Sequence, residues 1–209
     1  MKTNITTVIF ILTSLSIYSQ VSFEKKANII AFGADLGVYQ YTSKTLYNNL
    51  SSTTSAANKT LSLLYERAIL NWLGVGAKIG LNDYFTSVDS ITHTKPAVQA
   101  IDATVLVNAH FVRSKHVDLL AGFNVGYSNL NYEARDASIS SAKGGGLMFD
   151  LHFQPRFYFG KHIGMFINLA YINYNYQNLD FQNTSLKVVD VLQLKGGGVN
   201  FGLGIQGKF

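Results

Sequence analysis

Apolar and polar residues alternate along residues 147–159. The odd positions carry leucine, phenylalanine and proline, whereas the even positions include Asp150, His152, Gln154 and Arg156. Successive side chains of a β-strand point to opposite faces, so this period of two predicts a strand with one apolar face and one polar face. A helix would mix the two sets around its surface.

Seven other stretches alternate in the same way, which predicts an all-β chain of eight antiparallel strands. The other strands are expected at 28–41, 60–70, 73–85, 98–112, 117–130, 163–176 and 197–209. Polar segments predict long loops at 42–59, 86–97, 131–145 and 177–195, although 186–194 could extend the neighbouring strands. Short turns are expected at 71–72, 113–116 and 160–162. Long and short connections therefore alternate along the chain.

Two details of this pattern stay open. Arg67 falls among the apolar side chains of 60–70, either because the strand is bulged or because Arg67 lies near a membrane edge and extends into water. In 163–176, one face carries Ile163 and Leu169, but the other face is mixed and includes Phe166. The orientation of that strand is not decided by its pattern.

The N-terminus predicts export from the cytoplasm. Residues 1–19 combine Lys2, a hydrophobic stretch from Ile5 to Ile17 and the small residue Ser19, as a cleaved signal peptide does. Residues 20–209 are then expected to form one barrel domain. The sequence contains no cysteine, so neither a lipid anchor on cysteine nor a disulfide framework is expected.

The composition favours a membrane β-barrel. Charged residues make up 14% of the chain, about half the share usual in soluble domains. No segment after the signal offers about 20 consecutive apolar residues for a spanning helix. Only helices and closed barrels satisfy their backbone groups in lipid, so the apolar faces are expected to meet lipid and the polar faces the lumen. The net charge of +5 is spread singly, which argues against nucleic-acid binding.

The predicted last strand ends in an aromatic residue. Phe209 is preceded at alternate positions by Val199, Phe201, Leu203, Ile205 and Gly207. This pattern resembles the C-terminal signature of bacterial outer-membrane proteins, although a larger residue is expected in place of Gly207. The mature chain resembles the small eight-stranded outer-membrane barrels.

The resemblance implies an eight-stranded antiparallel up-and-down transmembrane β-barrel in the bacterial outer membrane. Short turns would face the periplasm and long loops the outside. Phe209 would serve as the insertion signal. The implied partners are outer-membrane lipids, the barrel insertion machinery and periplasmic chaperones.

The polar faces predict the content of the lumen. Together with Lys208, the inward set holds Asp35, Glu66, Lys78, Asp102, His110, Asp118, Asp150, His152 and Arg156. Eight strands enclose a space just wide enough for side chains, and buried charges must be paired. We therefore expect a polar network that plugs the lumen, while the inward glycines leave a narrow channel or a small cavity as the alternative.

Catalysis, cofactors and metal binding are not expected. The histidines lie in the middle of a strand, in a predicted loop or near short turns, and no nucleophile, base and orienting group converge. They are His93, His110, His116, His152 and His162. Neither paired histidines at ligand spacing nor thiols suggest a metal site.

Aromatic residues are expected in two girdles at the membrane interfaces. The girdle at the short turns would hold Trp72, Phe111, Phe157, Phe159 and Phe209, and the girdle at the long loops Tyr39, Tyr84, Tyr127 and Tyr171.

Three functions fit the sequence. The first is an integral outer-membrane barrel with a structural or surface-interaction role, a mostly plugged lumen and outer loops that meet a surface ligand. The second is a narrow channel for small or hydrophobic solutes. The third is a soluble periplasmic barrel of lipocalin type, which would place Phe149, Phe153 and Phe157 in a cavity and Asp150 in water.

Overall fold

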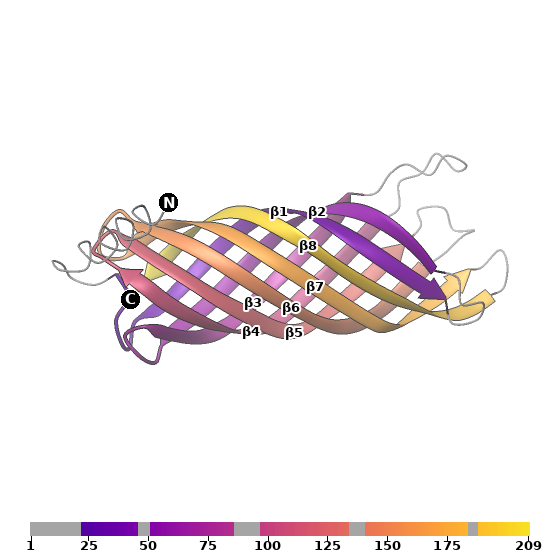
Figure 1. Ribbon diagram of the computed structural model, residues 1–209, viewed down its shortest axis with the longest axis horizontal. Coiled ribbons are helices and arrows are strands. Elements are labelled where there is room, and N and C mark those ends of the chain that lie inside the picture. Colours follow the sequence, from indigo (N-terminus) through magenta and orange to yellow (C-terminus); the bar gives the residue numbers. More distant parts are fainter. Residues whose placement is uncertain (1–21, 46–50, 86–96, 134–140, 184–187) are drawn as a thin grey trace, which may run out of the picture.

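Eight antiparallel strands close into one barrel (Figure 1). The computed structural model describes residues 22–45, 51–85, 97–133, 141–183 and 188–209. Consecutive strands pair with each other, and β1 pairs with β8. The strands are β1 (Asn28–Thr45), β2 (Ser51–Ala68), β3 (Leu73–Phe85), β4 (Ala97–Arg113), β5 (Val117–Glu133), β6 (Ser141–Tyr158), β7 (Ile163–Asn183) and β8 (Val188–Lys208). The predicted fold class is confirmed.

The face that carries the polar residues of each strand lies inside the barrel, although on β7 this face is mixed and includes Phe166 and Ile172. On β6, Asp150 and Arg156 are fully buried, whereas Leu147 and Leu151 on the other face are 62% and 52% exposed. This arrangement of faces is the reverse of that in a soluble barrel. Among the described residues, no helix is long and apolar enough to cross a membrane.

The apolar side chains on the outside form a belt that does not cover the whole barrel. On β1 the outward residues are apolar from Ile30 to Val38, and then Gln40, Thr42 and Lys44 follow. The strands continue beyond this belt to the end of the barrel that lies opposite the C-terminus in Figure 1. We call this the long-loop end and the other the short-turn end.

Three of the predicted long loops are wrong over most of their length. β1 and β2 stay paired out to Lys44 and Ser51, β5 and β6 out to Glu133 and Ser141, and β7 and β8 out to Asn183 and Val188. Above the belt, the outward side chains of the described residues in these segments include Thr42, Ser51 and Thr53, whose face meets water. Polar composition therefore marked the absence of lipid and not the absence of a strand.

Other sequence predictions fall on residues that the structure does not describe. The signal peptide at 1–19 and His93 are both among them, as is nearly all of the predicted loop 86–97. Ala97, the last residue of that predicted loop, is the first of β4.

The two open details are decided by the pairing. Arg67 is exposed, lies one residue before the end of β2, and pairs without a register shift to Asn28 and Val75. It therefore lies at the short-turn edge of the belt and not in a bulge. On β7, Phe166 and Ile172 are buried while Ile163 and Leu169 are exposed, which orients this strand.

Candidate functional site: the filled lumen

A cluster of charged residues closes the lumen near the short turns. Arg156 Nη2 lies 2.7 Å from Glu66 Oε2, and its Nε donates to Gln154 Oε1 at 2.8 Å. His110 lies between two carboxylates, with Nδ1 2.9 Å from Asp118 and Nε2 2.8 Å from Glu66. Arg156 and His110 are thus the two basic side chains that face the carboxyl groups of Glu66 and Asp118, and these four residues form the basal cluster.

The segment before β1 caps the basal cluster. Phe23 is fully buried and stacks on His110, with ring centroids 3.4 Å apart and an angle of 10° between the rings. The amide of Ser22 donates to the carbonyl of Ser114 at 3.0 Å, which ties the segment to the β4–β5 turn. The short-turn mouth is therefore closed by an aromatic ring that the sequence patterns did not predict.

A second cluster fills the middle of the lumen. Asp150 is fully buried; it receives Asn124 Nδ2 at 2.6 Å and lies 2.8 Å from His152 Nδ1. Lys78 Nζ approaches the same carboxylate at 3.6 Å. The other ring nitrogen of His152 lies 2.9 Å from Asn108 Oδ1. This mid-lumen cluster joins four strands.

Two further carboxylates have amide and hydroxyl partners. Asp35 accepts from Asn168 Nδ2 at 2.8 Å. Asp102 accepts from Asn82 Nδ2 at 2.7 Å and from the Tyr174 hydroxyl at 2.9 Å. Hydrogen bonds of this kind are what buried polar groups need in a space that excludes water.

Inward glycines make room for these side chains. A Cβ atom at Gly202 would overlap the carboxylate of Asp35, and one at Gly74 would overlap the carboxylate of Glu66. These two glycines therefore do not widen a channel, because charged side chains of neighbouring strands occupy the space beside them.

Tyrosines fill the lumen above the charged clusters. Tyr39, Tyr174 and Tyr176 are at most 1% exposed, and the rings of Tyr174 and Tyr176 stack with centroids 5.8 Å apart. Tyr41 donates to the hydroxyl of Tyr84 at 3.0 Å. The prediction that Tyr39 and Tyr84 belong to a membrane girdle is wrong, since both point inward; Tyr127 and Tyr171 do lie outside.

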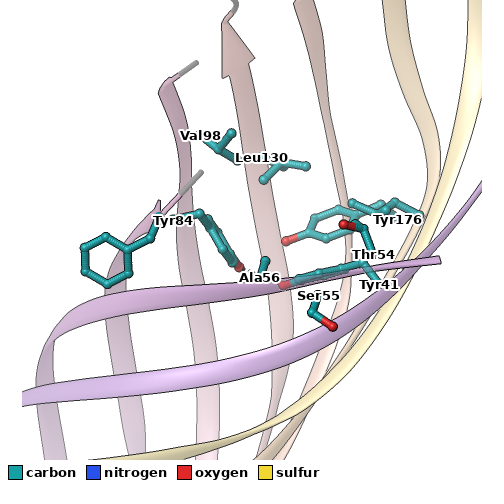
Figure 2. Close-up of a pocket in the computed structure, with 10 residues that line it drawn as sticks. Tyr41, Thr54, Ser55, Ala56, Tyr84, Val98, Leu130 and Tyr176 are labelled. Carbon is teal, nitrogen blue, oxygen red and sulfur yellow. Dashed lines mark hydrogen bonds between the residues drawn. The ribbon is translucent and has the colours of Figure 1, made fainter. Parts of the chain in front are cut away.

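A pocket of about 320 Å³ opens above this tyrosine layer. The rings of Tyr41, Tyr84 and Tyr176 converge on it in Figure 2, and Val98 and Leu130 lie across from them. Two hollows between the charged clusters hold only about 20 and 10 Å³, space for about one water molecule each. The pocket is therefore a cup at the long-loop end and does not continue through the barrel.

The structure places all nine polar residues predicted for the lumen inside the barrel. They divide among separate groups: Glu66, His110, Asp118 and Arg156 at the base, Lys78, Asp150 and His152 in the middle, and Asp35 and Asp102 with neutral partners. Lys208 does not join them, because its Nζ lies 5.6 Å from the ring centre of Tyr158 near the mouth. Asn108 and Asn124 face inward as the alternation predicts, and Asn168 lies on the inner face of β7; all three bond within the lumen, although they were not counted in the predicted polar network.

The four histidines that the structure describes have structural partners. His110 and Asp118 form a buried pair, but Phe23 covers the imidazole ring. His116 and His162 bond through Nδ1 to the carbonyls of Tyr158 and Lys208. Among the described residues, no group of three or more His, Cys, Asp or Glu side chains could hold a metal ion.

The fold was compared with solved structures. The outer membrane protein OprG from Pseudomonas aeruginosa matches with a TM-score of 0.62 and 14% sequence identity, over 91% of this chain and 99% of that chain. The chain has the fold of a bacterial outer-membrane β-barrel. Its apolar belt and polar interior are those that such barrels present to lipid and to the lumen. The predicted resemblance is confirmed at the level of the fold, and the outer membrane is the location that this barrel fits.

Two other solved outer-membrane proteins are similar at lower scores. Ail of Yersinia pestis matches with a TM-score of 0.45 and 12% identity, over 88% of this chain and 99% of that chain. The outer membrane protease OmpT from Escherichia coli matches with a TM-score of 0.49 and 9% identity, over 93% and 100%. No protein-family model and no curated protein matches the sequence.

Proposed function

We propose that this outer-membrane barrel is not an enzyme and has an occluded lumen, and that it acts as a structural or surface-interaction protein. The observation that carries the proposal is the continuous filling of the lumen. Phe23, the basal cluster, the mid-lumen cluster and the tyrosine layer each fill the lumen at a different level, and two hollows between these levels hold only about 20 and 10 Å³.

The long-loop end supports the interaction role. There β1 and β2 continue above the apolar belt with the outward side chains of Gln40, Thr42 and Lys44 in water. A wall of paired strands holds this surface rigid, which lowers the entropic cost of binding a partner. A surface ligand would therefore meet the strand extensions first.

Phe209 fits the proposed role of insertion signal. Its side chain is 63% exposed on the outer surface, and its backbone exchanges hydrogen bonds of 2.8 and 3.0 Å with Asn28 at the seam between β8 and β1. The insertion machinery would thus meet an aromatic side chain next to the seam where β8 pairs with β1.

The lipocalin alternative is wrong. It requires Phe149, Phe153 and Phe157 in a central cavity, whereas all three are outside and 37–40% exposed. It also requires Asp150 and Arg156 in water, and both are fully buried.

The occluded lumen predicts that the protein does not conduct ions. Purified protein inserted into a planar phospholipid bilayer should produce no stepwise current, because an ion would have to displace paired charges from a space too narrow for its water shell. A general porin inserted in the same bilayer is the positive control. Reproducible single-channel steps from the folded protein would contradict the proposal and favour the narrow channel.

A second candidate function is the binding of a small apolar or aromatic ligand in the tyrosine-lined cup. Its volume of about 320 Å³ lies at the lower end of the range for ligand pockets, and its lining combines aromatic rings with the aliphatic side chains of Val98, Leu130 and Leu194. The hydroxyls of Tyr41 and Tyr84 already bond to each other. They would orient a polar group on an otherwise apolar ligand.

Filling the cup should abolish this binding. Ala56 is partly buried and lines the cup (Figure 2), so A56W should remove the fluorescence increase of the neutral dye N-phenyl-1-naphthylamine on titration with protein. Thr42 is exposed on the outer face of the same end, and T42W should keep the wild-type increase. Equal binding by A56W and wild type would place the dye elsewhere.

A further inference from the structure

A hollow of about 660 Å³ lies at the short-turn end, separate from the filled lumen. It is bounded by the segment before β1, the β4–β5 turn, the β6–β7 turn and the end of β8. Its lining includes five lysines and one acidic side chain, Glu24; the lysines are Lys25, Lys26, Lys115, Lys161 and Lys208. We call it the basal hollow.

The lysines of the basal hollow lack carboxylate partners. No salt bridge involves any of the five among the residues that the structure describes, whereas Lys59 and Lys143 at the long-loop end pair with Asp83 and Glu133 at 2.9 and 3.1 Å. Like charges gathered around one concave surface repel each other and concentrate a positive potential there. An anion bound in the hollow would relieve that repulsion.

The basal hollow borders the apolar belt. Phe209 lines the hollow and is also 63% exposed on the outer surface. Phe159 and Ile163, which flank the β6–β7 turn, are 71% and 66% exposed. A ligand with an anionic head in the hollow could therefore lay a hydrocarbon chain on the neighbouring belt.

The backbone holds part of the lining in a fixed position. Lys26 has a φ of 79°, the one positive value among described residues other than glycine, and its amide donates to the carbonyl of Ala68 at 3.0 Å. The amide of Lys25 donates to Asn71 Oδ1 at 3.0 Å. An unfavourable conformation that the surroundings maintain is typical of a site with a function.

We propose that the basal hollow binds the phosphate of an anionic phospholipid from the leaflet at the short-turn end. Clusters of four to eight basic residues beside a membrane attract anionic lipids, and lysine binds phosphate as a compact point charge. The continuity with the belt favours a lipid over a soluble phosphate. The lipid head would neutralise Lys115 of the β4–β5 turn and Lys161 of the β6–β7 turn.

Native mass spectrometry of the full-length mature protein in zwitterionic detergent tests the proposal. Dioleoylphosphatidylglycerol should bind at least about tenfold more tightly than dioleoylphosphatidylcholine, and less tightly as the salt concentration rises. The variant K115Q/K161Q should lose this preference. The matched control K59Q/K143Q, which removes two lysines from the other end, should retain it.

A band that shifts on boiling shows that each variant is folded, so a failure of folding is distinguished from a loss of binding. Equal binding of both lipids by the wild type, or equal loss in both double variants, would overturn the proposal. If glycerol 1-phosphate binds as tightly as phosphatidylglycerol, the hydrocarbon chains contribute nothing to binding. That result would overturn the proposal of a lipid ligand in favour of a soluble phosphate ester.

Discussion

Replacing Arg156 with methionine is expected to lower the free energy of unfolding by about 3–5 kcal/mol, because removing one partner of a buried charge pair leaves the other uncompensated. Arg156 is fully buried and bonds to Glu66 at 2.7 Å. After the substitution, His110 alone would face the two carboxylates of Glu66 and Asp118. Reversible urea unfolding from phospholipid vesicles would measure the change.

Two variants separate the loss of pairing from the loss of packing. In R156M/E66Q one anion is removed together with the cation, so part of the stability should return. K59Q removes a lysine whose pair with Asp83 lies at the surface, with both side chains about half exposed, and should cost about 1 kcal/mol or less. A loss for R156M no larger than that for K59Q would mean that the basal cluster does not hold the barrel together.

An arginine in the middle of the apolar belt is the second large effect. Leu203 on β8 is 49% exposed and pairs with Ala34 and Ile167, about halfway along the apolar stretch of β1. L203R should lower the free energy of unfolding from vesicles by about 2–4 kcal/mol, since a charge at the centre of the bilayer lies far from water.

The control for L203R lies at the border of the belt. Ile163 is the first residue of β7 and is 66% exposed, so I163R should cost only about 0–1 kcal/mol because the guanidinium can reach the interface. Equal costs at the two positions would mean that the belt is not centred on Leu203. Negligible costs at both would contradict the orientation of the faces.

The sequence predicted the barrel because one local rule applies to every strand. Residues one apart point to opposite faces, so Leu147 and Met148 are assigned to outside and inside without knowledge of any other strand. The short turns were predicted for a similar reason, since each lies where the alternation stops for two to four residues.

The extent of the strands was predicted less well. The predicted loop at 42–59 was inferred from its serine and threonine content, but β1 and β2 pair through most of it. Above the belt the outer face of a strand meets water, so the apolar half of the alternation is absent. The inward Tyr39 and Tyr41 of β1 were the remaining signal there, and Tyr39 was assigned to a girdle instead.

The sequence by itself determined which side chains face the lumen on most strands, though not on β7, whereas only the tertiary structure decided which of them meet. Glu66 and Arg156 are 90 residues apart, and closure of the barrel with a particular stagger of strands brings them to 2.7 Å. Phe23 precedes the first strand, so no alternation could place its ring on His110. The alternation along one strand indicates which face a side chain lies on. Which side chains contact each other across the lumen depends on the stagger and closure of all eight strands together.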